Sequence, residues 1–166
     1  MCEFDTAQTY SIALQMDTVL REEFVEFTYS LSSDVEMVSP FIDQLMRKIN
    51  ILRPMDGTEV DIEVALREAL LNAVIHGNRE DPSKHIYLRV RCRADGEFSM
   101  AIRDEGAGFE IDSVPDPTAP EQLMSTHGRG IYLMRALMDE VSFEEGGTVV
   151  QMRKRPSLAN NQAPQQ

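Results

Sequence analysis

The chain has 166 residues, of which 42% are hydrophobic and 27% charged, and its formal net charge at pH 7 is −12. This length is enough for one domain with a hydrophobic core, and the composition is ordinary for a globular protein. The excess of negative charge opposes binding to nucleic acid backbones and anionic membranes, although a local site for a nucleotide remains compatible with it.

The sequence shows no sign of export or membrane insertion. It contains no run approaching the roughly 18 apolar residues that span a bilayer, and its acidic N-terminus lacks the pattern of a secretory signal. Cys2 and Cys92 match no metal-binding or redox spacing. We therefore expect a reduced, cytoplasmic setting.

The N-terminal part contains an arm, a strand and a helix. Residues 1–22 have mixed polarity, and the choice between a short helix and a loose arm stays open. Alternating apolar and polar residues predict a strand over Phe24–Leu31. Ser33 or Asp34 is suited to cap the helix that follows, which ends near Pro54. Its apolar stripe has helical spacing and comprises Val38, Phe41, Ile42, Leu45, Met46 and Ile49.

A second helix begins at Thr58, where the sequence TEVD has the pattern of a capping box. Glu68 and Asn72 are four residues apart and therefore lie on one face of this helix. The predicted core stripe lies on a different face and comprises Leu66, Leu70, Ala73 and Gly77. Gly77 and Asn78 are suited to end the helix.

The C-terminal half predicts four more strands and one helix around a long loop. HIYLRVRCRA and EFSMAIRDEG alternate around a turn at Asp95-Gly96, which predicts a hairpin with Ile86, Leu88, Val90, Cys92, Phe98, Met100 and Ile102 facing inward. An irregular connection follows over 106–127, then a helix in GIYLMRALMDEV and a hairpin around Gly146-Gly147. We expect the polar tail, 156–166, to be disordered.

This order of elements predicts an α+β fold. It is a two-layer sandwich in which a mixed, mostly antiparallel sheet is covered on one face by helices. The expected organisation is an arm over 1–22, a single domain over 23–155 and the tail.

Two groups of residues fit the two ends of a nucleoside triphosphate. At the base end, Asp104 follows a strand and can accept a hydrogen bond from the exocyclic amine of adenine. Gly106 and Gly108 allow backbone and base to approach closely. At the phosphate end, Asn72 offers an oxygen to Mg²⁺, and Glu68 can take the proton of a nucleophile that attacks the γ-phosphate.

The sequence HGRG supplies the third part of such a site. Gly128 and Gly130 form a predicted turn that leads into a helix, whose free N–H groups and dipole favour phosphate. The long loop can close over the phosphates.

Each motif alone also has a simpler interpretation. A Glu/Asn pair on a helix is more often solvated surface, and D-x-G-x-G is often only a turn. His76 and His127 have no third partner at ligand spacing, so we interpret them as helix-end and loop residues. However, the motifs occur together in the order that one bound nucleotide requires, and this favours a nucleotide site.

The motifs REALLNAVIHGN, IRDEGAGFEID and HGRGIYLMRALMDEV resemble the nucleotide-binding boxes of the GHKL ATPase superfamily, and more narrowly the anti-sigma factor serine-protein kinases. The resemblance spans about 24–155. It implies a Bergerat-type fold, with Glu68 as general base, Asn72 as the Mg²⁺ ligand and Asp104 as the adenine contact beside Gly106 and Gly108. Gly128, Arg129 and Gly130 take the place of the phosphate-side turn.

The resemblance also implies an activity and its partners. ATP with Mg²⁺ is the expected phosphoryl donor, and a serine of an anti-anti-sigma protein is the acceptor. A sigma factor or another regulator is held inactive by the kinase. We expect the kinase to be a homodimer in which Phe24–Leu31 supplies an edge strand.

Three other functions compete with this one. The runner-up is a nucleotide-binding regulatory module that sequesters a partner without phosphorylating it, although such a module has no need of Glu68. The ATP-binding part of a histidine kinase is disfavoured because no helix with a phospho-accepting histidine precedes the domain. An α+β domain that binds no nucleotide is the remaining alternative.

Overall fold

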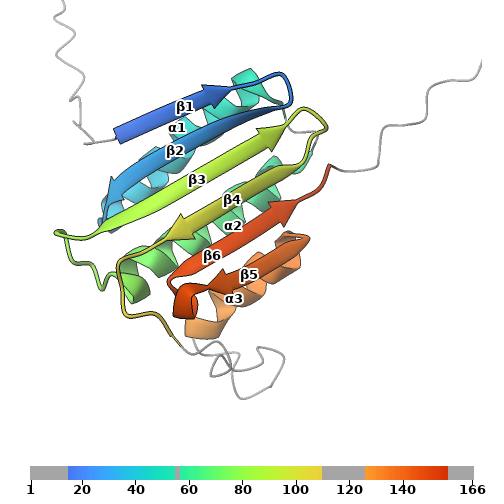
Figure 1. The fold of residues 1–166 in the computed structure, drawn as a ribbon. Helices are drawn as coiled ribbons and strands as arrows, with labels where there is room; N and C mark the ends of the chain where they lie inside the picture. The colour runs from blue at the N-terminus through green and yellow to red at the C-terminus, as the bar shows by residue number, and fades with distance from the viewer. Residues whose placement is uncertain (1–14, 55–56, 110–125, 157–166) are drawn as a thin grey trace, which may run out of the picture.

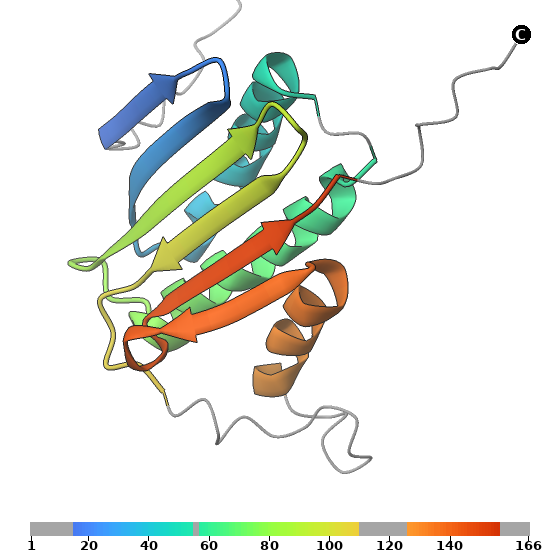
Figure 2. The ribbon, with the colours of Figure 1, turned by 45° about the vertical axis from the view of Figure 1, so that its right-hand side comes forward.

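The computed structural model describes residues 15–54, 57–109 and 126–156. One six-stranded sheet forms the first layer, and α1, α2 and α3 lie together on one of its faces as the second layer (Figure 1 and Figure 2). The predicted α+β two-layer sandwich is therefore confirmed.

The strands are β1 (Gln15–Leu20), β2 (Phe24–Ser32), β3 (His85–Arg93), β4 (Phe98–Arg103), β5 (Glu140–Glu144) and β6 (Val149–Lys154). The helices are α1 (Val35–Leu52), α2 (Glu59–Leu71), the π-helix η1 (Asn72–Gly77), α3 (Thr126–Leu137) and the short 3-10 turn η3 (Glu145–Gly147). The order across the sheet is β1-β2-β3-β4-β6-β5. Every neighbouring pair of these strands is antiparallel. We expected a mixed, mostly antiparallel sheet, and the described sheet is instead entirely antiparallel.

The inward rows of side chains explain why the sequence forms this sheet. Every second residue of β3 is buried, as its alternation predicts. In register across four strands, Phe27 pairs with Val90, Val90 with Met100 and Met100 with Met152, and all four are buried. The helices cover this apolar face.

The helices follow the predicted stripes, with one difference at a cap. Asp34 caps α1, accepting a hydrogen bond from the backbone N–H of Glu36 at 2.9 Å, and the six predicted stripe residues of α1 are buried. In the predicted stripe of the second helix, Leu66, Leu70 and Ala73 are buried, whereas Gly77 is half-buried. Thr58 is the N-cap residue of α2, but its side chain makes no capping hydrogen bond, so the predicted capping box is not formed.

The N-terminal residues Gln15–Leu20 form a strand that their sequence pattern does not predict. The sheet therefore begins before the expected domain start at residue 23. Strand β2 lies between β1 and β3, so the expectation that Phe24–Leu31 supplies an edge is wrong, and β1 and β5 are the edges of the described sheet.

Helix α3 begins and ends earlier than predicted. It spans Thr126–Leu137, and Glu140 and Val141 belong to β5 instead of the helix. The hairpin at Gly146-Gly147 is confirmed, with η3 joining β5 to β6. The predicted arm before Gln15, most of the long loop and nearly all of the tail lie outside the described residues.

None of the helices in the described part of the chain combines the length and the apolar character needed to cross a membrane.

Candidate functional site

A cavity of about 270 Å³ opens at one end of the sheet, where η1, α3 and the η3 turn meet the ends of β4 and β6. Its lining is mainly apolar, with a few polar groups, as is usual for a small-molecule site. It comprises Ala69, Asn72, Ala73, His76, Gly77, Ile102, Asp104, Gly108, Phe109, Ile131, Met134, Phe143, Gly147, Thr148 and Val150. Three of the predicted site residues, Asn72, Asp104 and Gly108, are among them.

The carboxylate of Asp104 lies directly on the Cα of Gly77. A Cβ at Gly77 would collide with this carboxylate, and a Cβ at Gly106 would collide with the carbonyl oxygen of Gly77. The end of η1 and the segment after β4 therefore pack backbone to backbone. Residue 77 must be glycine because any side chain there would overlap the Asp104 carboxylate. The close approach places this carboxylate in the wall of the cavity.

Two hydrogen bonds fix the position of Asp104. Its backbone N–H donates to the carbonyl oxygen of Thr148 at 3.0 Å, which ties the end of β4 to the start of β6. The N–H of Gly106 donates to Asp104 Oδ1 at 2.8 Å. Oδ1 is thus engaged within the loop, and Oδ2 remains to accept a hydrogen bond from a ligand.

Burial is the main influence on the acidity of Asp104. It raises the pKa of this carboxyl group above the usual value, while the Gly106 N–H and the positive charge of Lys84 act in the opposite direction. A half-buried carboxylate in an apolar cavity is a strong hydrogen-bond acceptor for a ligand that brings a donor.

Glu68 and Asn72 lie together against α3, one helical turn apart. A Cβ built at Gly130 would lie 2.9 Å from Glu68 Oε2 and 3.2 Å from Asn72 Nδ2. Glu68 does not line the apolar cavity, whereas Asn72 does. Asn72 therefore lies between the cavity and Glu68, as expected if base and terminal phosphate occupy opposite ends of one ligand.

The HGRG segment is positioned differently from the prediction. Gly128, Arg129 and Gly130 lie within the first turns of α3 and do not form a turn before it. Arg129 is exposed, and Gly130 is buried against α2. The helix start still lies beside Glu68 and Asn72, so its free N–H groups remain available to a phosphate near this pair.

Several cavity residues carry no functional signal in the sequence. Thr148 follows the Gly-Gly turn, and its hydroxyl donates to the carbonyl oxygen of Glu145 at 3.0 Å. Phe109 donates its N–H to Gly146 O at 2.9 Å and packs edge-on against Phe143, with ring centroids 5.5 Å apart. A hairpin pattern alone does not reveal that such residues face a ligand cavity.

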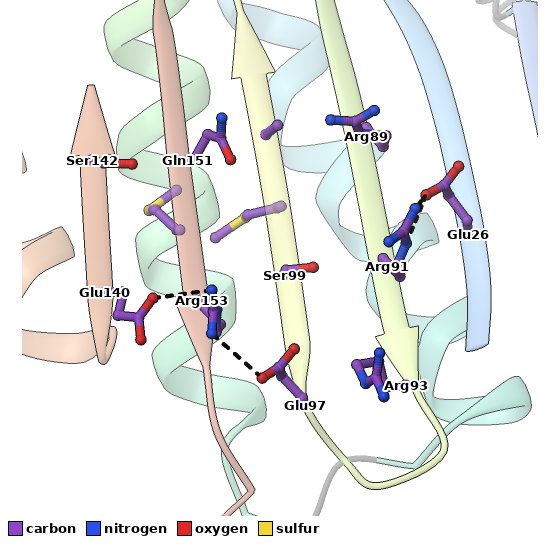
Figure 3. Close-up of a pocket in the computed structure, with 13 residues that line it drawn as sticks. Glu26, Arg89, Arg91, Arg93, Glu97, Ser99, Glu140, Ser142, Gln151 and Arg153 are labelled. Atoms are coloured by element: carbon purple, nitrogen blue, oxygen red, sulfur yellow. Dashed lines mark hydrogen bonds and ion pairs between the residues drawn. The ribbon is translucent and has the colours of Figure 1, made fainter. Parts of the chain in front are cut away.

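A second hollow, of about 360 Å³, lies on the sheet face that the helices leave open (Figure 3). Two of its arginines form ion pairs across strands: Arg91 with Glu26 at 2.7 Å, and Arg153 with Glu140 at 3.2 Å. Such solvated cross-strand pairs stabilise a sheet only weakly. The hollow contains none of the predicted site residues.

Within the described ranges, no three His, Cys, Asp or Glu residues form a group that could hold a metal ion. Asn72, an amide that such a group would not include, stays a predicted metal ligand. A single protein oxygen fits Mg²⁺ when substrate phosphates and water complete its coordination.

Comparison with known proteins assigns the fold to a family. The family described as "Histidine kinase-like ATPase domain" matches residues 31–154, which include both halves of the site. The chain belongs to this family. The resemblance carried by the three motifs is therefore confirmed, and an ATPase domain implies ATP as ligand.

The chain is also similar to several anti-sigma F factors. It is 33% identical over 105 residues to the one from Heyndrickxia coagulans, covering 59% of this chain and 70% of the relative. With that of Priestia megaterium it shares 31% over 122 residues, 69% and 80% of the two chains. With that of Clostridium perfringens it shares 31% over 147 residues, 84% and 98%.

Proposed function

We propose that this protein is an ATP-dependent protein-serine kinase that phosphorylates an anti-anti-sigma partner and also holds a sigma factor inactive. The observation that carries the proposal is the placement of Glu68 and Asn72 against Gly130 of α3, beside a cavity with the Asp104 carboxylate in its wall. The similarity to proteins named anti-sigma F factors supports the sigma factor as partner.

The cavity accounts for recognition of the base. Oδ2 of Asp104 accepts a hydrogen bond from the exocyclic amine of adenine, and apolar residues such as Met134 and Val150 pack against the rings. Gly106 and Gly108 bring the loop backbone close to the base. A guanine or hypoxanthine ring presents an oxygen at the position of the amine and is repelled by the carboxylate.

The phosphates extend from the cavity toward α3. Asn72 would hold Mg²⁺, which offsets the charge of the phosphates when it is bound. The first turn of α3 contains Gly128 and Arg129, and its backbone N–H groups are the proposed phosphate contacts. Gly130 keeps α3 close enough to Glu68 and Asn72 to close this end of the site.

Glu68 is the proposed general base. The serine hydroxyl oxygen of the partner attacks the γ-phosphorus, and the bond from that phosphorus to the β–γ bridging oxygen breaks. The products are phosphoserine and ADP, and the hydroxyl proton passes to the Glu68 carboxylate. The chain thus contributes a positioned base and a binding site, and the partner contributes the nucleophile.

We also propose that the protein forms a homodimer. The edge strand β1 offers unpaired backbone groups along one side of the described sheet.

The proposal is tested by measuring transfer of radiolabelled γ-phosphate from ATP to a purified anti-anti-sigma protein. Glu68→Gln should lower the transfer rate at least a hundredfold, because the base is lost, while the Kd for ATP changes little. Glu63→Gln is the matched control, since Glu63 lies on the same helix and pairs with Arg67 at 3.0 Å.

Two results would contradict this assignment. Transfer that survives Glu68→Gln would exclude Glu68 as the base. Tight binding of the partner by the unmodified protein without any transfer would favour the regulatory module that only sequesters.

A further inference from the structure

We propose that Asn78 is a positioning residue for base recognition, holding Asp104 in place through the neighbouring backbone. This inference rests on the proposed function, because it assumes that Asp104 contacts adenine. Asn78 is fully buried, follows η1 directly and does not line the cavity.

Three consecutive backbone N–H groups around the carboxylate have three different acceptors. The N–H of Asp104 donates to Thr148 O at 3.0 Å, and the N–H of Gly106 donates to Asp104 Oδ1 at 2.8 Å. Between them, the N–H of Glu105 donates to Asn78 Oδ1 at 2.8 Å. Among these three bonds, only the one to Asn78 joins the loop to a side chain of another segment.

Asn78 is itself held at two further points. Its backbone N–H donates to Ala73 O at 2.8 Å, the closing bond of the π-helical segment. Its Nδ2 donates to His85 O at 3.0 Å, at the start of β3. The one amide group therefore joins the end of η1, the start of β3 and the loop after β4, and each of its polar atoms has a partner.

A second set of bonds reaches the same loop from the exposed side. Glu105 accepts hydrogen bonds from the N–H of His85 at 2.8 Å and from the hydroxyl of Tyr87 at 3.0 Å. Because these bonds are exposed to water, they hold the loop less firmly than the buried amide does. Tyr87 therefore provides a control position in the same network.

Loss of the Asn78 amide should affect the two ends of the nucleotide unequally. The bond from the Glu105 N–H is broken, so the Asp104 carboxylate loses its fixed place on Gly77. Glu68 and Asn72 lie on α2 and at the start of η1, before the altered residue, and keep their contact with α3. Recognition of the base should therefore weaken more than binding of the triphosphate.

The test measures Kd values for ATP and ITP, which differ by an amine and an oxygen on the base. Asn78→Ser removes both side-chain bonds, and Asn78→Asp keeps the size and an acceptor but loses the donor to His85. In Asn78→Ser the preference for ATP over ITP should fall about tenfold, the value of a hydrogen bond to a charged group. Asn78→Asp keeps the acceptor for the Glu105 N–H and should therefore retain the preference. Tyr87→Phe should leave the preference unchanged, and Asp104→Ala should abolish it.

The outcomes separate this inference from the proposed function. If Asp104→Ala abolishes the preference and a folded Asn78→Ser variant retains it, the role of Asn78 is overturned and the proposed function stands. If the unmodified protein shows no preference for ATP, the adenine contact is overturned and this inference with it.

One measurement needs no variant and decides the case if both Asn78 variants fail to fold. Hydrogen exchange of the Glu105 amide in the unmodified protein should be slow and should slow further when ADP is added. Exchange as fast as that of an unprotected amide would overturn the proposal.

Discussion

Replacement of Asp104 by asparagine should change which purine the protein prefers. In the unmodified protein, the Gly106 N–H donates to Oδ1 at 2.8 Å, and Oδ2 remains for the ligand. In Asp104→Asn, the same N–H requires the amide oxygen at the Oδ1 position, because an amide nitrogen there would place two donors against each other. The –NH₂ group then faces the base.

The magnitude follows from the two hydrogen bonds that change. Adenine loses a bond to a carboxylate, about 1.5–3 kcal/mol, and its amine then faces another donor. The ring oxygen of hypoxanthine gains a neutral bond of about 0.5–1.5 kcal/mol. Together these changes should shift the ratio of the Kd values for ATP and ITP on the order of a hundredfold toward ITP.

The assay is calorimetric titration of both nucleotides with Mg²⁺ present, or competition against a fluorescent nucleotide. Asp95→Asn is the control: it makes the same change of charge in the β3–β4 turn, where Asp95 accepts from the N–H of Glu97 at 3.1 Å. An Asp104→Asn protein that keeps the full preference for ATP would refute the assignment of this carboxylate to the base.

The same titration has a pH dependence. Burial raises the pKa of Asp104, so the carboxyl group gains its proton at a higher pH than an ordinary aspartate does. Protonation removes the charged acceptor, and ATP affinity should therefore fall as the pH falls through this raised pKa. Asp104→Asn should show no such loss.

The remaining predictions concern the phosphate end and the core. Gly130→Ala should lower phosphoryl transfer about a hundredfold, because the new Cβ would lie 2.9 Å from Glu68 Oε2 and displace this catalytic base. The affinity for adenosine should change far less. Unchanged transfer from radiolabelled ATP in this variant would refute the prediction. Burial raises the pKa of the Cys92 thiol to about 12. In a Cys2→Ser variant at pH 8, Cys92 should therefore react with iodoacetamide only after denaturation. Rapid labelling of the folded variant, detected by mass spectrometry, would show that the thiol is not buried.

The parts of the fold that the sequence predicts are those with a buried, periodic face. Strand β3 buries alternate residues and α1 has a stripe at helical spacing, so both were found nearly to their ends. Strand β1 is an edge whose residues 17–20 are all exposed. It has no buried alternation, and pairing with β2 is what makes it a strand.

Helix α3 shows tertiary contact overriding local preference. Glycine lowers helix propensity by about 1 kcal/mol, so Gly128 and Gly130 predict a turn. In the fold, Gly130 lies inside α3, where the helix packs closely against Glu68. A larger residue at this position would push the helix away from Glu68. The same glycines that obscured the helix boundary therefore mark the site.

The sequence predicts candidate site residues where chemistry restricts the residue type, as for Glu68 and Asp104. It does not single out Thr148 or Asn78, since a threonine after a turn and an asparagine after a helix are common without any ligand. Their proposed roles depend on contacts between segments distant in sequence, such as the bond from the Glu105 N–H to Asn78 Oδ1.

The central claim is that one nucleotide reaches from Asp104 to Glu68. A crystal structure with a non-hydrolysable ATP analogue and Mg²⁺ tests it most directly. We predict the adenine amine at Asp104 Oδ2, the phosphates between Asn72 and the start of α3, and the γ-phosphorus facing the Glu68 carboxylate. An analogue bound elsewhere, or a γ-phosphate remote from Glu68, would contradict the account.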